Sequence, residues 1–318
     1  MHTDILLKFD LALKKRSDLL DKSNNHTNAF RLIHSLGDDF EGLTVDKLGS
    51  VILVEKHSSK VDANPLVDAI TARFGPDASI FLKERWSPDK VLRSGAIVAG
   101  PRHNGLVQVL ELGLLYNLNL CDDEHIGLFL DSRSIRKHVC EISKNKRVLN
   151  LFSYTGGFGM SAQSGGARST TNVDNKRSAL TRAKQNWVLN NLPFDSRTFL
   201  NSDAIKFLRR ATAGAGRYDL VILDPPPRFK QSGRNDFNAR TGYARLVARC
   251  MMLLEPDGYL LAGLNALTVN DEAFNDMLIE AGTLARRETQ TLKSLVPGCD
   301  FPYSPDRPSA RFELICVR

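Results

Sequence analysis

The stretch VLNLFSYTGGFG, residues Val148 to Gly159, begins as a short apolar run and ends in a glycine-rich turn. Phe158 and the small residues behind it are suited to open a helix. A buried strand that runs into a glycine turn at a helix N-terminus lets the backbone approach a ligand closely. The alternative is an ordinary turn in which glycine only supplies positive φ. The stretch matches neither G-x-G-x-x-G nor G-x-x-x-x-G-K-[ST], which argues against dinucleotide binding and an NTPase.

From about residue 135 to the C-terminus, short apolar runs alternate with segments of helical spacing. Strands are predicted at 148–152, 169–173, 198–200, 218–223, 258–263 and 312–317. Helices are predicted at 135–142, 158–165, 176–190, 204–210, 241–254 and 271–284. This alternation predicts an α/β fold with a doubly wound, mostly parallel, Rossmann-like sheet and helices on both faces.

The preceding part of the chain has a different pattern. A charged N-terminal helix is followed by short β candidates at 29–33, 43–46 and 51–55, a helix at 66–74 and a β pair at 107–120. These segments predict a small α+β domain. We therefore expect two domains, residues 1–126 with the N-terminal helix and 127–318 with the doubly wound sheet.

Composition places the chain among ordinary globular proteins. Of its 318 residues 42% are hydrophobic and 25% charged, which suffices for two domains and a sizeable core. No apolar run approaches the roughly 20 residues that span a bilayer. Asp4, Lys8 and Asp10 interrupt the apolar region that a signal peptide would need. We expect a cytoplasmic protein without membrane contact.

The net charge of +7 mildly favours a polyanionic partner such as nucleic acid, although a solvated basic surface would produce the same number. The five cysteines stand far apart, without a Cys-x-x-Cys pair. This spacing argues against a disulfide framework or a structural zinc site, so we expect reduced thiols and no metal.

Polar residues follow the predicted strands where ligands bind in an open doubly wound sheet. Asp174 ends the second strand, where an acid can accept hydrogen bonds from ribose hydroxyls. Asp203 ends the third, where a polar side chain can reach an adenine amino group. Either acid could instead cap the helix behind it. The predicted nucleoside-cofactor residues on these strands are Phe152, Ser153, Tyr154, Thr155, Gly156, Gly157, Asp174, Asn175, Asp203, Ala204 and Asp224.

The stretch YDLVILDPPP, Tyr218 to Pro227, is the most specific signal. When prolines directly follow a buried strand, they terminate its hydrogen-bond ladder and stiffen the loop behind it. The proline carbonyls can accept a hydrogen bond from the amino group of a base. Asp224 beside them can hydrogen-bond or protonate a ring nitrogen. An acid followed by Pro-Pro at the fourth strand is typical of methyltransferases that act on nitrogen or on ring atoms of bases. The alternative is a rigid turn.

With these motifs the sequence resembles the S-adenosylmethionine-dependent methyltransferases of large-subunit ribosomal RNA, whose best-known members make 5-methylcytosine. The resemblance covers roughly residues 28 to 318. Its markers are AFRLIHSLGDDFEGLTVDKLG (29–49), GLFLDSRSIR (127–136), VLNLFSYTGGFG, LDPPP and GCDFP (298–302), where the family tends to have Asp-His-Pro.

The resemblance implies a class I methyltransferase domain with a seven-stranded sheet behind a small α+β domain that docks RNA. It implies S-adenosyl-L-methionine as cofactor, S-adenosyl-L-homocysteine as product, and 23S ribosomal RNA or a pre-ribosomal particle as partner. A homodimer is left open. By the resemblance, Leu130, Asp131 and Arg133 lie beside the cofactor. From spacing alone, Arg133 and Arg136 could equally be a basic helix face that meets phosphate.

The sequence departs from the family pattern at several places. An acid usual at the end of the first strand is replaced, with Asn150 and Ser153 nearby. Pro227 and Arg228 intervene before Phe229, the ring expected to stack on the target base. Many members carry an N-terminal PUA domain, and we expect none here, because too few residues precede Ala29 to hold one.

The departure that bears most on the reaction is Asn265, which stands where the family has a cysteine. Cytosine carbon-5 becomes nucleophilic only after a thiolate adds to carbon-6. Cys299, in the C-terminal loop, is the remaining candidate for that thiolate. A base nitrogen could instead attack the methyl group directly, which requires positioning and desolvation. Carbon-5 and nitrogen both stay open.

The residues predicted to contact the methyl-accepting base come from the LDPPP stretch with the following Phe229, and from Asn265 after the fifth strand. Asp224, Pro225 and Asn265 are predicted to orient the base for catalysis, and Pro226, Pro227 and Phe229 to contact it. Two alternatives are a methyltransferase of the same fold for a small molecule or a protein, and a non-catalytic ribosome-assembly factor that binds S-adenosylmethionine.

Overall fold

The computed structural model describes residues 2–21, 23, 26–122, 124–211, 217–229, 237–265, 269–306 and 310–318. The chain divides into two compact units. Unit 1 comprises Met1–Arg133 and Pro297–Ser309, and unit 2 comprises Ser134–Val296 and Ala310–Arg318. The predicted second domain, 127–318, was continuous, whereas in the structure Pro297–Ser309 belongs to unit 1. None of the described helices is long and apolar enough to cross a bilayer.

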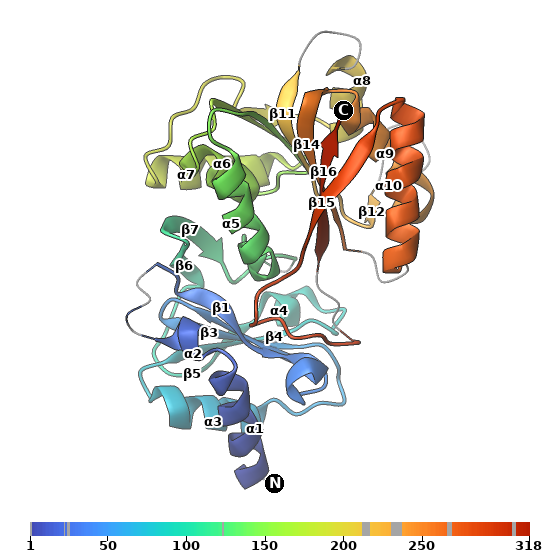
Figure 1. The fold of residues 1–318 in the computed structure, drawn as a ribbon. Coiled ribbons are helices and arrows are strands. Elements are labelled where there is room, and N and C mark those ends of the chain that lie inside the picture. Colours follow the sequence, from blue (N-terminus) through green and yellow to red (C-terminus); the bar gives the residue numbers. More distant parts are fainter. Residues whose placement is uncertain are drawn as a thin grey trace. The chain divides into compact units, whose positions relative to one another are not determined.

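Over its described residues, unit 1 is built on a five-stranded sheet of order β1-β2-β3-β4-β5, and of these strand pairs only β3–β4 is parallel (Figure 1). Its strands are β1 (Ala29–His34), β2 (Leu43–Leu48), β3 (Val51–Lys56), β4 (Ser79–Glu84) and β5 (Ala96–Ala99), with a separate hairpin of β6 (Leu106–Glu111) and β7 (Leu114–Asn119). Its helices are α1 (His2–Lys14), α2 (Ser17–Leu20), α3 (Asn64–Phe74), α4 (Lys90–Ser94) and the 3-10 turns η1 (Ser35–Asp38) and η2 (Leu130–Ser132).

Helices α1 and α3 pack their apolar faces against this sheet. Phe9 of α1 and Ile70 of α3 are fully buried in one cluster with Val54 of β3. Burial of such a side chain contributes about 1.5–3 kcal/mol. The amphipathic spacing of the helices therefore places the core of unit 1 between them and the sheet.

A buried carboxylate explains why the C-terminal segment belongs to unit 1. The Asp300 side chain is fully buried and accepts from Arg133 Nη2 at 2.6 Å and Arg133 Nη1 at 3.1 Å. It also accepts from the backbone N–H of Arg31 at 3.1 Å, and its own carbonyl accepts from Arg16 Nη2 at 2.9 Å. A buried carboxylate requires such partners, since an unpaired one would cost several kcal/mol. Contacts between residues so far apart in the chain leave no local sequence signal.

A second buried ion pair, Arg16–Asp38, yields a stability prediction. Arg16 Nη1 and Nη2 donate to the two Asp38 oxygens at 2.7 and 2.5 Å, and both side chains are fully buried. Asp38→Asn would leave a buried guanidinium unpaired, so we expect the unfolding free energy of unit 1 to fall by about 3–5 kcal/mol. Urea unfolding followed by Trp86 fluorescence in a Trp187→Phe background measures it.

The pH dependence of the same pair provides a further check. Burial raises the pKa of Asp38, but hydrogen bonding and charge from Arg16, together with hydrogen bonds from Lys15 and the His34 backbone, lower it more, so the net pKa is below its ordinary value. The stabilisation is therefore complete near neutral pH and is lost as pH falls through the folded-state pKa. The difference between wild type and Asp38→Asn should shrink in acid. The exposed neighbour Asp39→Asn is the control, and an equally large loss there would contradict the assignment.

Unit 2 contains a seven-stranded sheet, counted over its described residues, of order β10-β9-β8-β11-β14-β16-β15 (Figure 1). The pairs are parallel except at β16, which runs antiparallel to β14 and β15. The strands are β8 (Arg147–Leu151), β9 (Ser169–Asp174), β10 (Phe199–Asn201), β11 (Tyr218–Leu223), β14 (Leu254–Leu264), β15 (Thr289–Leu295) and β16 (Arg311–Val317), and a small ladder joins β12 (Arg228–Phe229) to β13 (Phe237–Asn238). The helices are α5 (Arg133–Ile142), α6 (Gly157–Ser164), α7 (Arg177–Leu189), α8 (Ala204–Ala211), α9 (Ala239–Met251) and α10 (Asp271–Ala285). The predicted mostly parallel, doubly wound sheet is confirmed.

Both faces of this sheet are covered by helices. Leu223 of β11 packs in one cluster with α9 and α10, represented by Val247 and Phe274. Its neighbour Ile222 packs in the other cluster with α5 and α6, represented by Val139. Successive strand residues point to opposite faces, so a strand that is buried on both sides must be apolar throughout. This is why the central strands read as continuous apolar runs.

Candidate functional site

The central parallel strands of unit 2 end in register. Leu151 of β8 pairs with Val173 of β9 and with Leu223 of β11. Leu223 in turn pairs with Ala262 of β14. The turns after these strands therefore lie along one edge of the sheet, where open α/β folds bind ligands. The predicted residues at this edge are 152–157, Asp174, Asn175, 224–227 and Asn265, and β10 brings Asp203 and Ala204 to its end.

The turn after β8 has an unusual backbone. Phe152, Tyr154 and Gly156 have φ of 56°, 48° and 79°, which is the left-handed region. For the two non-glycine residues this conformation costs about 1–3 kcal/mol each and persists where the surroundings enforce it, as at ligand sites. At Gly156 a Cβ atom would lie 3.2 Å from Ala183 Cβ and 3.4 Å from the Trp187 ring. Glycine is therefore required at 156 both for its φ and for the close packing of α7.

Asp174 fixes this turn from the neighbouring strand. Its Oδ2 accepts from the backbone N–H of Tyr154 at 2.8 Å, and its Oδ1 accepts from the N–H of Lys176 at 2.8 Å. The helix α7 begins only at Arg177. The N-cap of α7 is Lys176, so the alternative interpretation of Asp174 as the helix cap is wrong. Asp174 instead binds the backbone N–H of that cap residue and also holds the turn after β8. Each oxygen retains a lone pair that could accept a ribose hydroxyl.

Ser153 provides a test of whether a polar ligand fits this turn. The side chain is buried, 6% exposed, and its hydroxyl has no hydrogen-bond partner among the described residues. Buried hydroxyls are normally hydrogen-bonded, because an unsatisfied one costs about 1–3 kcal/mol. A ligand with amino, carboxylate or hydroxyl groups at the turn would satisfy it. The donor set here fits the methionine and ribose parts of S-adenosylmethionine.

Asp203 has a defined structural role. Its Oδ1 accepts from the backbone N–H of Lys206 at 2.8 Å, and its carbonyl accepts from the N–H of Phe207 at 2.9 Å. It is therefore the N-cap of α8, as the alternative in the sequence analysis stated. A contact with adenine stays a prediction for Asp203 and for Ala204 behind it.

The loop after β11, which is predicted to contact the methyl acceptor, lies at the same edge. Asp224 is partly exposed, Pro225 is buried, and Pro226 and Pro227 are exposed. The Pro227 carbonyl accepts from the backbone N–H of Ala239 at 3.0 Å. This carbonyl was expected to accept from a base, but it holds the start of α9 instead. Asp224 and Pro225 keep their predicted place at the strand end.

The Phe229 ring belongs to an aromatic stack. It lies 4.4 Å from Phe237, nearly parallel, and 5.1 Å from Phe152, centroid to centroid. The β12–β13 ladder holds Phe229 and Phe237 opposite each other. One face of the Phe229 ring is therefore covered by protein, and a base could stack only on the part of the ring that is left uncovered. Phe237 and its ladder were not anticipated, because two-residue strands have no sequence periodicity.

Asn265 is exposed directly after β14. The preceding strand end is held by Tyr243 of α9, which is fully buried and whose hydroxyl donates to the Gly263 carbonyl at 2.7 Å. Burial raises the pKa of Tyr243 well above its usual value, so the hydroxyl keeps the proton it donates. Tyr243 is a positioning residue for this strand end that sequence reasoning missed, since a helical tyrosine gives no signal of its partner.

The cysteines of unit 2 lie away from this edge. Cys250 is fully buried in α9 and Cys140 is half-buried in α5, and burial raises the pKa of both thiols. Cys316 pairs with Tyr259 near the start of β14, at the opposite edge. The two other cysteines, Cys121 and Cys299, are exposed in unit 1. No cysteine of unit 2 is placed to attack a base beside Asp224.

Leu130, Asp131 and Arg133 lie in unit 1. Leu130 and Asp131 line a pocket of about 160 Å³ together with Arg31, Asp46 and Phe301. Their role beside the cofactor stays a prediction.

The alternative interpretation of Arg133 and Arg136 as a basic helix face is wrong. Arg133 is bound to Asp300. Arg136 is 3% exposed and lies over the Phe158 ring, with 5.9 Å from its guanidinium carbon to the ring centroid. Neither guanidinium is presented to phosphate. The burial of both side chains explains the difference, and spacing alone could not reveal it.

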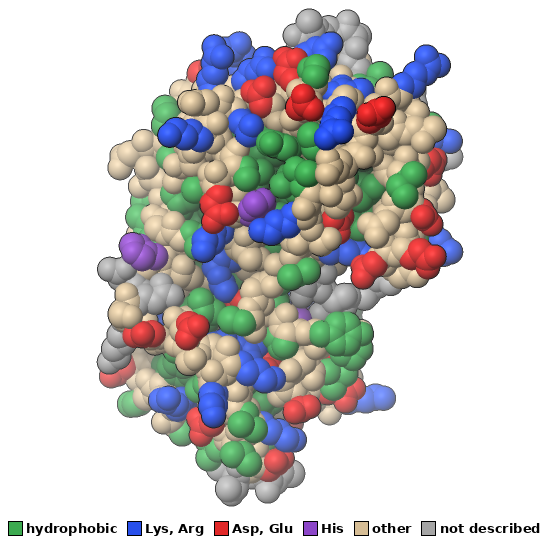
Figure 2. Space-filling model, in the orientation of Figure 1, with side chains coloured by type: hydrophobic (Ala, Val, Ile, Leu, Met, Phe, Trp, Pro, Cys, Tyr) green, Lys and Arg blue, Asp and Glu red, His purple; other side chains and the backbone are tan. Residues whose placement is uncertain are grey.

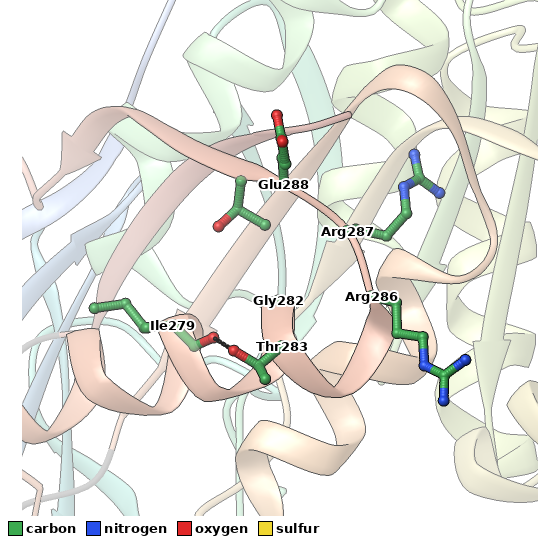
Figure 3. A pocket seen from close by; sticks show the side chains of 7 residues that line it. Ile279, Gly282, Thr283, Arg286, Arg287 and Glu288 are labelled. Atoms are coloured by element: carbon green, nitrogen blue, oxygen red, sulfur yellow. Dashed lines mark hydrogen bonds between the residues drawn. The ribbon is translucent and has the colours of Figure 1, made fainter.

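A larger hollow, about 380 Å³, lies elsewhere on unit 2 (Figure 3). Ile279 and Thr283 of α10 line it with Arg286 and Glu288 at the turn into β15. Thr289, which begins β15, pairs with the last residue of β16, which in turn pairs with the start of β14. The hollow is therefore at the edge opposite the site, and size alone does not identify the place of chemistry.

Comparison with known proteins shows which methyltransferases this chain is similar to. Residues 31–310 match the family model for S-adenosylmethionine-dependent methyltransferases. Ribosomal RNA large subunit methyltransferase I of Aliivibrio fischeri is 30% identical over 284 residues, 88% of this chain and 71% of that protein. The protein of the same name from Photobacterium profundum is 28% identical over 97% of this chain and 78% of its own length. The solved structure of the methyltransferase SMU.776 with SAH has a TM-score of 0.88 at 25% identity, covering 99% of this chain and 82% of that one.

Proposed function

The chain belongs to the S-adenosylmethionine-dependent methyltransferase family, and from this premise we propose that it methylates a nitrogen of a base in large-subunit ribosomal RNA. The relatives named for large-subunit ribosomal RNA support the substrate class. The choice of nitrogen rests on one observation at the C-terminal end of β14. Asn265 is exposed there, and none of the unit 2 cysteines lies beside it to supply the thiolate that carbon-5 transfer requires.

The residues divide into a cofactor side and an acceptor side. The turn Ser153–Gly157 would hold the methionine part, with the Ser153 hydroxyl as one polar contact and Asp174 on the ribose. When bound, S-adenosylmethionine supplies an electrophilic methyl group on a sulfonium. Asn175, Asp203 and Ala204 follow the strands where the adenine would lie.

Asp224 and its neighbours orient the acceptor. The Asp224 carboxylate can accept from an amino group of the base, which directs the base nitrogen at the methyl carbon. The nitrogen lone pair would form the new C–N bond as the C–S bond breaks, and the sulfur would keep the electron pair of that bond. Where the nitrogen carries a proton, the proton would pass to the Asp224 carboxylate. Pro225 stiffens the loop, and Asn265 can donate to a carbonyl of the base. The base must leave its stack to enter such a site.

The choice between nitrogen and carbon-5 is tested by trapping. A carbon-5 enzyme adds a thiolate to carbon-6 and is captured as a covalent adduct by RNA that contains 5-fluorocytosine. We expect methyl transfer to large-subunit ribosomal RNA from cells that lack the protein, without any adduct on denaturing gels. Adduct formation that is lost in Cys299→Ser would contradict nitrogen transfer and assign the thiolate to Cys299. A covalent cytosine-C5 methyltransferase serves as the positive control.

A further inference from the structure

The positive charge of this chain is concentrated in one segment. Residues 176–217 contain nine of the 43 lysines and arginines but two of the 36 aspartates and glutamates. The rest of the chain holds 34 residues of each sign and is neutral. The entire net charge of +7 therefore resides in α7, β10, α8 and their connections. A net charge that came from a generally solvated surface would be spread along the chain.

The fold places this segment at one border of unit 2. β10 is the terminal strand of the sheet and pairs only with β9 among the described strands. α7 leads into β10 and α8 leads away from it. Figure 2 shows lysine and arginine side chains on the upper part of unit 2, with acidic side chains among them. Five exposed cations define what we call the basic edge: Arg177, Lys184, Arg197, Lys206 and Arg210.

Few acidic groups neutralise the basic edge. Between residues 175 and 194 there is no aspartate or glutamate, and Arg177 and Lys184 are seven residues apart, on the outward stripe of α7. The buried stripe of that helix is apolar, represented by Ala183 and Trp187. Arg197 is 85% exposed, and its ion-pair partner in the described part of the chain is Asp195, 3.6 Å away. Exposed pairs of this kind contribute little, so Arg197 can exchange this partner for another anion.

We propose that the basic edge is an RNA-docking surface of unit 2 that contacts the phosphate backbone. This inference rests on the proposed function, in which RNA is the substrate. Charge complementarity selects the occupant, because a cluster of exposed cations with few acids binds polyanions through release of counterions. Phosphate contacts position an RNA without reading its sequence. The basic edge would therefore hold the substrate, while the loop after β11 selects the base.

Salt dependence of RNA binding tests the basic edge. The full chain is titrated onto deproteinised large-subunit ribosomal RNA from cells that lack the protein, from about 50 to 300 mM salt. If all five cations meet phosphate, replacing each with glutamine should make the slope of log K against log salt shallower by roughly 3 to 4, at about 0.7 per contact. The affinity for S-adenosylmethionine should not change, because none of these side chains is among the residues assigned to the cofactor.

A charge-matched variant controls for net charge. It replaces five exposed cations of unit 2 outside the segment with glutamine: Lys137, Lys144, Arg245, Arg286 and Lys293. The inference predicts a much smaller change of slope there. Equal changes in both variants would overturn it, while methyl transfer by the wild type would leave the proposed function intact. Absence of RNA binding by the wild type at low salt would overturn both.

Discussion

Replacing Asp174 with alanine is expected to raise the dissociation constant of S-adenosylmethionine about 100-fold. The carboxylate accepts from the Tyr154 N–H and the Lys176 N–H at 2.8 Å each. Its removal releases the turn after β8 and deletes the acceptor proposed for the ribose hydroxyls. Charge-assisted hydrogen bonds contribute about 1.5–3 kcal/mol each, and about 1.4 kcal/mol corresponds to a factor of ten. The loss of one or two of them gives the expected magnitude.

Equilibrium titration of S-adenosylmethionine measures this effect without any RNA. Asp174→Asn keeps one acceptor oxygen and should be intermediate. The matched control is Asp195→Ala, an exposed aspartate of the same unit whose Oδ1 accepts from the Arg197 N–H at 2.7 Å. A variant Asp174→Ala that is folded and binds S-adenosylmethionine as tightly as the control would remove Asp174 from the cofactor site.

Asp224→Asn is expected to lower kcat for RNA methylation about 1,000-fold while changing S-adenosylmethionine affinity by less than about tenfold. The substitution keeps size and place at the end of β11 but removes the negative charge and one acceptor. Orientation of the base nitrogen and proton removal both depend on that carboxylate in the proposed mechanism. Single-turnover kinetics at saturating RNA separates this effect from weaker RNA binding.

Asp219→Asn is the control for Asp224 on the same strand. Asp219 lies at the opposite end of β11, where its oxygens accept from Arg147 Nε at 3.1 Å and Nη2 at 3.0 Å. Hydrogen bonds from Arg147 lower the pKa of Asp219. Its loss should reduce stability and leave kcat nearly unchanged. Equal kcat losses in the two variants would mean that Asp224 acts only through the fold.

The central sheet of unit 2 and the glycine turn after β8 could be predicted from the sequence because their signals are local. Strands buried on both faces must be apolar throughout, and the glycine turn after β8 must follow one of them. Asp174 is the last residue of β9, as predicted, whereas Asp203 lies two residues beyond the end of β10. Their roles were ambiguous because an N-cap and a ligand contact both require a short side chain with an oxygen acceptor. Only the structure assigned Asp203 to the cap.

The remaining features depend on contacts that the sequence does not display. β15 reads TQTLKSL and is exposed at six of its seven positions, so it has no hydrophobic alternation. Pro297–Ser309 joins unit 1 through Asp300, which is buried against Arg133 from a distant part of the chain. Because Arg133 is buried in this ion pair, it does not form the exposed basic helix face that its spacing to Arg136 had suggested. In each case pairing with another part of the chain decided the structure, and such pairing leaves no local signal.

The central claim, methyl transfer from S-adenosylmethionine to a base of large-subunit ribosomal RNA, is tested most directly by mass mapping of modified nucleosides. Ribosomal RNA is compared between cells that contain the protein, cells that lack it, and cells that carry Asp224→Asn. We expect that one N-methylated nucleotide of the large-subunit RNA is absent without the protein, returns with the wild type and does not return with Asp224→Asn. Identical maps in all three would contradict the claim.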